Sequence, residues 1–162
     1  MLLRWILRQL MRALGWRVVS AFPTGIKKAV LIIAPHTSNW DAFYGLSFCF
    51  IKQLPIRFAV KQEALIFPLG LMLKWMGAIP IDRGQSLRPS PPRSAIYFMA
   101  SLFQQQASLI LIIAPEGTRS RVKRWRRGFY HIAMQAQVPI MLGYIDYTKK
   151  QVSPGPAFYP TG

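Results

Sequence analysis

Leu31-Ile32-Ile33-Ala34-Pro35 decides the fold, because the same five residues recur at Leu111-Ile112-Ile113-Ala114-Pro115. Short apolar, β-branched runs that end at a proline are typical of buried strands, since proline cannot donate to a sheet ladder and favours extended geometry in the residue before it. Polar segments follow both runs, at residues 36–41 and 116–120. If the two strands are parallel neighbours, both segments lie at one edge of the sheet, where open α/β folds place their sites. The repeat is too short to indicate an internal duplication.

Strand and helix patterns alternate along the chain. The expected strands cover residues 29–34, 56–60, 77–81, 109–114 and 138–144, and the expected helices cover 39–51, 63–75, 93–106 and 128–137. This alternation predicts an α/β fold with a largely parallel sheet flanked by helices. No linker divides the chain, so we expect one domain over residues 1–162. The chain stops soon after Pro154-Gly155-Pro156, which is consistent with an incomplete C-terminus that lacks a strand or cap.

The composition combines a basic charge with a high apolar content. There are 21 Lys and Arg residues against 5 Asp and Glu residues, which gives a formal charge of +16, while 52% of the residues are hydrophobic. Together these values favour a protein that works at a bilayer surface. No uninterrupted apolar stretch reaches the roughly 18 residues of a spanning helix. The chain has one cysteine, Cys49, which lies in an apolar run and has no basic residue or histidine beside it. We therefore expect its thiol to be packed in the core. A single cysteine is also consistent with a reducing compartment.

The first twenty residues predict a membrane-associating helix. Arg4, Arg8 and Arg12 recur every four residues and share one helical face, and leucine, isoleucine and methionine cover most of the remainder. Trp5 and Trp16 add amphipathic rings that favour the headgroup region. Such a helix lies in the interface with its arginines towards lipid phosphates. A surface helix packed on the domain is the alternative, and the interrupted apolar run argues against a signal peptide.

The first polar segment contains the residue types of a general base. Ser38 or Asn39 is positioned to cap the helix that follows, which places Asp41 in its first turn, close to the loop that holds His36. A carboxylate bonded to one imidazole nitrogen fixes the tautomer and raises the basicity of the other nitrogen. Ser38 as a nucleophile and a purely structural histidine remain open alternatives. A metal site is not expected, because His36 and His131 are the only histidines and no second ligand pair has zinc spacing.

The second polar segment is suited to a phosphorylated substrate. Gly117 permits a tight turn, Thr118 can donate a hydrogen bond or act as a cap, and Arg119 carries a planar fork that matches phosphate oxygens. Glu116 is expected to hold an arginine or a substrate hydroxyl in place.

A third segment repeats this design. The expected strand at 77–81 leads to Arg83, a second candidate phosphate ligand. The basic run at 121–127 surrounds Trp125 and is interpreted as a solvated or lipid-facing loop.

Four short blocks, in this order, resemble the glycerolipid acyltransferases typified by 1-acylglycerol-3-phosphate acyltransferase. His36-Thr37-Ser38-Asn39-Trp40-Asp41 is similar to the His-x4-Asp block of that family, residues 77–83 to its second block, residues 115–120 to its third and residues 138–140 to its fourth. The Glu-Gly-Thr-Arg block is the most specific of these. Pro80 and Asp82 depart from the apolar residues that are common in the second block, which leaves the acyl acceptor open.

The resemblance implies a glycerol-3-phosphate acyltransferase-like fold and a reaction without a metal, a cofactor or a covalent acyl-enzyme. His36, oriented by Asp41, would take the proton from a lysophospholipid hydroxyl, which would attack the thioester of acyl-CoA or of acyl carrier protein. The acceptor, most simply 1-acylglycerol-3-phosphate, would be bound by Arg83, Glu116, Gly117, Thr118 and Arg119. Members of the family work at membranes, so the resemblance implies a peripheral or monotopic bacterial protein on the cytoplasmic face of the inner membrane.

Two other classes of protein fit part of the sequence. A nucleic-acid-binding module would explain the charge of +16 and the basic run at 121–127. A non-catalytic membrane-binding module would explain the N-terminal helix. Neither gives a reason for His36 with Asp41, so no nucleic acid is expected as a partner.

Overall fold

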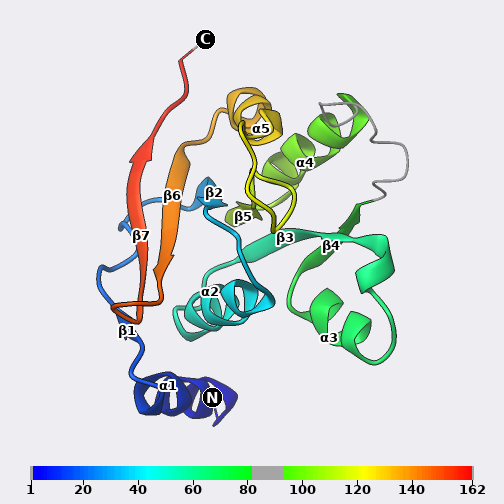
Figure 1. Cartoon of the computed structure of the whole chain (residues 1–162). Coiled ribbons are helices and arrows are strands. Elements are labelled where there is room, and N and C mark those ends of the chain that lie inside the picture. The colour runs from blue at the N-terminus through cyan, green and yellow to red at the C-terminus, as the bar shows by residue number, and fades with distance from the viewer. Residues whose placement is uncertain (1, 82–92, 162) are drawn as a thin grey trace.

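A seven-stranded sheet forms the centre of the computed structural model, which describes residues 2–81 and 93–161 (Figure 1). The strands are β1 (Arg17–Val18), β2 (Lys28–Ile33), β3 (Ile56–Lys61), β4 (Ala78–Ile81), β5 (Leu109–Ile113), β6 (Ile140–Asp146) and β7 (Gln151–Phe158). The helices are α1 (Leu2–Ala13), α2 (Asn39–Ile51), the 3-10 turn η1 (Gln62–Ala64), α3 (Leu69–Trp75), α4 (Arg93–Gln105) and α5 (Gly128–Ala136).

The sheet has the order β1-β7-β6-β2-β5-β3-β4. Strands β2 to β6 are parallel to their neighbours, and β6 pairs with β7 in the antiparallel direction. The prediction of a largely parallel α/β sheet is therefore confirmed. The expected helix at 63–75 divides into η1 and α3, with Pro68 between them, because a proline interrupts helical hydrogen bonding.

The repeated pentapeptides lie on adjacent parallel strands, but they are out of step by one residue. Leu31 pairs with Ile112, and Val30 pairs with Leu111. Since successive side chains of a strand point to opposite faces, equivalent residues of the two copies pack on different sides of the sheet. Leu31 belongs to the core on the α2 side, whereas Leu111 belongs to the core beneath α4 and α5. The two copies therefore do not superpose as a structural duplication.

Two strands, β1 and β7, were not predicted from the sequence. β7 runs through Pro154 and Pro156, in a segment for which the sequence patterns predicted no strand. Proline is tolerated there because β1 covers only the first part of β7, at Gln151 and Val152, so β7 continues as an edge strand. The hydroxyl of Ser20 donates to the carbonyl oxygen of Pro154 over 2.9 Å and ties the segment after β1 to β7.

The N-terminal helix is shorter than the twenty residues expected. α1 ends at Ala13, and the chain then enters β1. Trp16 was expected at the headgroup region, but it is 6% exposed and stacks on Tyr44 of α2, with ring centroids 3.8 Å apart. Trp5 is 60% exposed. Among the described residues, no helix combines the length and apolar character needed to cross a membrane.

Candidate active site

A capping box brings His36 and Asp41 together at the start of α2. Ser38 is the N-cap residue, and its hydroxyl accepts the amide N–H of Trp40 over 2.9 Å. In return, the amide of Ser38 donates to Asp41 Oδ2 over 2.8 Å, so the carboxylate folds back over the preceding loop. The Nδ1 atom of His36 lies 3.2 Å from the same oxygen. The predicted cap and the predicted proximity of His36 to Asp41 are both confirmed.

Asp41 is 2% exposed and all its contacts favour the ionised form. Burial by itself would raise the pKa of this carboxyl, but a hydrogen bond from the Tyr147 hydroxyl, those from the amides of Ser38 and Thr37, and the neighbouring His36 outweigh it. The pKa of Asp41 therefore lies below its ordinary value. A carboxylate that is ionised at neutral pH and lies beside Nδ1 keeps the proton on that nitrogen and leaves Nε2 of His36 as the basic one.

Glu116 connects the second segment to the first. Its Oε2 atom accepts the backbone N–H of His36 over 2.7 Å. This bond joins the loops that follow β2 and β5, which the parallel pairing of those strands brings to the same edge of the sheet. Glu116 was expected to hold an arginine or a substrate hydroxyl; within residues 2–81 and 93–161 its carboxylate forms no ion pair with an arginine, and the hydroxyl stays a prediction. Glu116 instead fixes the backbone at the candidate base.

The turn after Glu116 brings Arg119 to the start of α2. Gly117 has a φ of +64°, a conformation that glycine adopts without strain, so the expected tight turn is confirmed. Arg119 Nη1 donates to Asn39 Oδ1 over 2.9 Å. The hydroxyl of Thr118 accepts the amide N–H of Ser120 over 3.3 Å.

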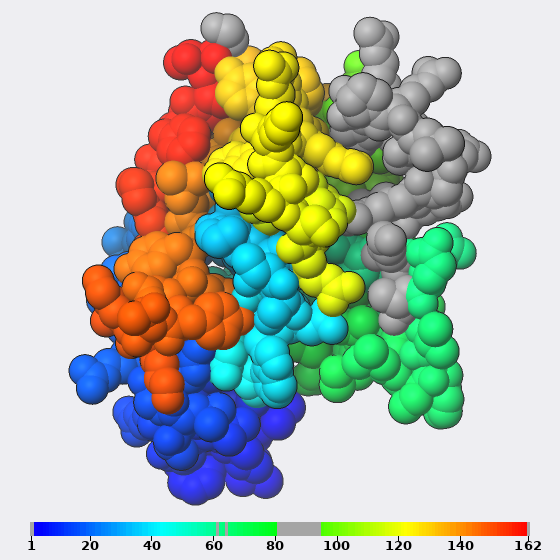
Figure 2. All heavy atoms as spheres, viewed as in Figure 1, coloured from blue at the N-terminus to red at the C-terminus, as the bar shows by residue number. Residues whose placement is uncertain are grey.

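A basic loop, residues 115–127, lies beside this site. Residues 115–127 lie against the segment around residue 40, as the yellow and cyan spheres of Figure 2 show. The loop is closed by the amide of Arg126, which donates to the carbonyl of Pro115 over 2.9 Å. Its exposed cations are Arg119, Arg121, Lys123, Arg124, Arg126 and Arg127. Arg83, the further phosphate ligand that was predicted, lies outside the described residues.

Comparison with known proteins identifies the family. A family model described as Acyltransferase matches residues 16–142, well over half of the chain. The chain belongs to this family. It is 34% identical over 121 residues to the 1-acyl-sn-glycerol-3-phosphate acyltransferase of Limnanthes douglasii, covering 71% of this chain and 40% of that protein. It is 32% identical over 139 residues to a probable 1-acyl-sn-glycerol-3-phosphate acyltransferase of Mycoplasma pneumoniae, covering 78% and 48% respectively.

The acyltransferase-family chain thus spans less than half the length of these two curated relatives. No solved structure gives a significant match. The family model covers the strands and loops that carry His36, Asp41 and residues 116–119.

Two residues of this acyltransferase-family site were not singled out from the sequence. Asn39 was considered only as a cap, yet it holds Arg119. Tyr147 lies in the turn after β6 and donates its hydroxyl hydrogen to Asp41 Oδ1. A signal was available for Tyr147, because β6 is parallel to β2 and the residues after both strands reach the same edge of the sheet.

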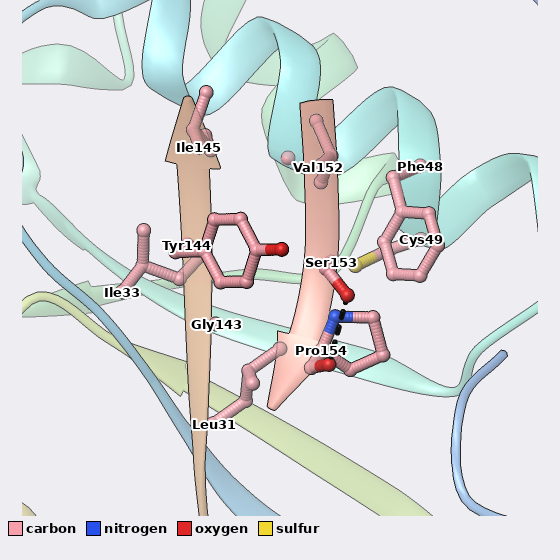
Figure 3. Close-up of a pocket in the computed structure, with 11 residues that line it drawn as sticks. Leu31, Ile33, Phe48, Cys49, Gly143, Tyr144, Ile145, Val152, Ser153 and Pro154 are labelled. Atoms are coloured by element: carbon pink, nitrogen blue, oxygen red, sulfur yellow. Dashed lines mark hydrogen bonds between the residues drawn. The ribbon is translucent and has the colours of Figure 1, made fainter. Parts of the chain in front are cut away.

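An apolar pocket lies beneath α2 in this acyltransferase-family fold. Figure 3 shows Phe48 and Cys49 of α2 beside Ser153 and Pro154 of β7. The space inside holds about one water molecule, far less than a fatty acyl chain needs, so we assign the pocket no substrate. Cys49 is 1% exposed, and burial raises the pKa of its thiol to about 12. The prediction of a packed rather than nucleophilic thiol is confirmed.

Among the described residues, no group of three or more His, Cys, Asp or Glu side chains is placed to hold a metal ion.

Proposed function

We propose that this protein moves a fatty acyl group from acyl-CoA or acyl carrier protein to the hydroxyl of a lysophospholipid, with 1-acylglycerol-3-phosphate as the acceptor. The observation that carries the proposal is the His36 Nδ1 to Asp41 Oδ2 contact of 3.2 Å, beside the segment that begins at Glu116. Family membership supports the reaction class, and the acceptor is suggested by the relatives, which are named as 1-acyl-sn-glycerol-3-phosphate acyltransferases.

The proposed reaction uses His36 first as a base and then as an acid. Nε2 takes the proton from the acceptor hydroxyl while that oxygen attacks the thioester carbonyl carbon. When the tetrahedral intermediate collapses, the carbon–sulfur bond breaks and the proton on Nε2 passes to the leaving sulfur. The products are the new ester and a free thiol, so the step needs no metal or other cofactor. Asp41 stabilises the imidazolium that forms in between.

The acceptor phosphate is proposed to bind where Arg119 now meets Asn39. A phosphate offers the guanidinium two oxygens in place of one amide oxygen and carries the charge that the amide lacks. Gly117, Thr118 and Glu116 shape the same turn, and Arg83 joins the proposed set on the sequence resemblance alone.

A bilayer is the proposed source of the acceptor. Five large apolar side chains of α1 are 41% to 71% exposed, namely Leu2, Leu3, Trp5, Ile6 and Leu10. Six more, in or just before α3, are 51% to 84% exposed, namely Ile66, Phe67, Leu69, Leu71, Met72 and Trp75. Both helices pack on the α2 side of the sheet, through Met11 and Leu73 (Figure 1). With a formal charge of +16, these apolar surfaces suit an anionic membrane.

We propose that the protein is peripheral or monotopic on the cytoplasmic face of the inner membrane. Vesicle flotation tests the membrane contact and the nucleic-acid alternative together. The protein is expected to float with vesicles that contain anionic lipid, with or without added RNA. Tight, salt-sensitive RNA binding without any lipid preference would favour the nucleic-acid-binding module instead.

Product analysis tests the reaction. The purified protein, given radiolabelled acyl-CoA and 1-acylglycerol-3-phosphate in detergent micelles, is expected to form labelled phosphatidic acid. Acyl carrier protein charged with the same chain distinguishes the two donors. Thioester hydrolysis at the same rate with and without acceptor, and no labelled phospholipid from either donor, would contradict the proposal.

A further inference from the structure

Tyr147 reaches the active site from a third strand end. It follows β6, which is the parallel neighbour of β2 on the side away from β5. Its hydroxyl donates a hydrogen bond to Asp41 Oδ1. The other carboxylate oxygen, Oδ2, is occupied by the amides of Thr37 and Ser38, at 2.6 and 2.8 Å, and by His36. Tyr147 therefore supplies the contact that the loop and capping box do not.

An aromatic cluster holds the ring of Tyr147 in this place. The ring meets Trp16 edge to face, with centroids 5.4 Å apart and an interplanar angle of 85°. It meets Tyr44 in the same manner at 5.9 Å and 79°. Trp16 stacks on Tyr44 and is 6% exposed, so the cluster joins the segment after α1, helix α2 and the turn after β6. Although Tyr147 is 44% exposed, two rings from other elements limit its movement.

The hydroxyl of Tyr147 is suited to act as a permanent donor. Burial and the hydrogen bond to Asp41 both raise the pKa of the phenol, so it keeps its proton throughout the working range of pH. A neutral donor leaves the negative charge on Asp41, where it orients the imidazole of His36.

We infer that Tyr147 is a positioning residue of the acyl-transfer site, which fixes the Asp41 carboxylate and through it the ring of His36, and that Trp16 and Tyr44 hold Tyr147 in place. This inference rests on the proposed function. As a positioning residue that acts through Asp41, Tyr147 is expected to affect the rate of the chemical step and to leave substrate affinity unchanged.

The test compares Tyr147→Phe with Tyr130→Phe. Tyr130 of α5 also donates its hydroxyl hydrogen, to the carbonyl of Thr161, so the control loses the same group and the same kind of bond elsewhere. For Tyr147→Phe we expect kcat to fall about tenfold, as for a hydrogen bond to a charged group, with KM within about twofold of wild type. Tyr130→Phe is expected to keep both values. An unchanged kcat in Tyr147→Phe, or an equal loss in the control, would overturn the inference.

A measurement that does not depend on turnover accompanies the kinetics. The titration of the Asp41 carboxyl, followed by carbon NMR, is expected to move to higher pH in Tyr147→Phe and to stay in place in Tyr130→Phe. An unmoved titration would overturn the inference even where the proposed function holds. If the titration moves but the wild-type protein transfers no acyl group, the proposed function fails and the tie between Tyr147 and Asp41 stands.

Discussion

The backbone N–H of His36 donates to the side-chain carboxylate of Glu116 over 2.7 Å, across the two loops that follow the repeated pentapeptides. This bond fixes the loop of the candidate base from the neighbouring strand, while Asp41 fixes its ring from the following helix. The geometry of His36 therefore depends on the loop that holds Glu116 and on the first turn of α2.

Removing the Glu116 carboxylate is expected to loosen the loop of His36. We predict that Glu116→Ala lowers the free energy of unfolding by about 1 to 2 kcal/mol, the cost of losing a hydrogen bond to a charged group at a half-buried site. Glu116→Gln, which keeps an oxygen acceptor, serves as the matched control and is expected to lose less than half of that. Urea unfolding measures both. Equal losses in the two variants would show that the accepting oxygen is not what holds the loop.

Gly117→Ala is expected to impair use of the acceptor. Its φ of +64° is costly for alanine, and the added Cβ would lie 3.0 Å from Arg126 Nε, so the side chain of Arg126 has to move away from the turn. Gly25→Ala is the control, because Gly25 also has a positive φ, of +91°, but has no atom within 4 Å of the added Cβ. Both variants should lose about 1 kcal/mol of stability. Only Gly117→Ala should raise the KM for the acceptor, and a similar rise in Gly25→Ala would remove the assigned role.

Arg119→Ala is expected to weaken binding of the phosphorylated acceptor and to leave the other substrates unaffected. Loss of the guanidinium fork should raise the KM for 1-acylglycerol-3-phosphate by about tenfold or more, and leave the KM for acyl-CoA and the use of a monoacylglycerol unchanged. Lys52→Ala removes the same charge at the far end of α2 and should leave all three values alone. Steady-state kinetics with the two acceptors decides this. An equal loss for the acceptor without phosphate would count against Arg119 as its ligand.

Asp41 should make the folding stability depend on pH in the acidic range. Because its pKa in the folded protein lies below the ordinary value, the ionised form stabilises the native state above about pH 4, and this stability is lost as the pH falls through the folded pKa. Asp41→Asn should abolish that part of the pH dependence, whereas Asp146→Asn should retain it. Thermal unfolding between about pH 2 and 6 provides the measurement. A wild-type slope preserved in Asp41→Asn would contradict the account of this carboxylate.

The sequence was sufficient for the features that depend on local pattern. The apolar runs ended by Pro35 and Pro115 predicted buried strands, and the order of residues from His36 to Asp41 predicted a helix cap with Asp41 turned back towards His36, because both arise within a few residues. The sequence was insufficient for features that depend on contacts between segments far apart in the chain. The burial of Trp16 follows from packing on Tyr44, and the strand at Pro154 from pairing with β6, neither of which has a local signal. The one-residue stagger of the repeat is likewise set by packing on two faces.

The most direct test of the central claim is the acceptor-dependent release of thiol from acyl-CoA, measured for the wild-type protein and for His36→Ala. Cys49 should not disturb a thiol reagent, since burial raises its pKa to about 12 and only the unfolded protein should react. If His36 is the base, we expect release to fall at least about a hundredfold in His36→Ala, while Tyr130→Phe stays at the wild-type rate. Undiminished, acceptor-dependent release in folded His36→Ala would contradict the account.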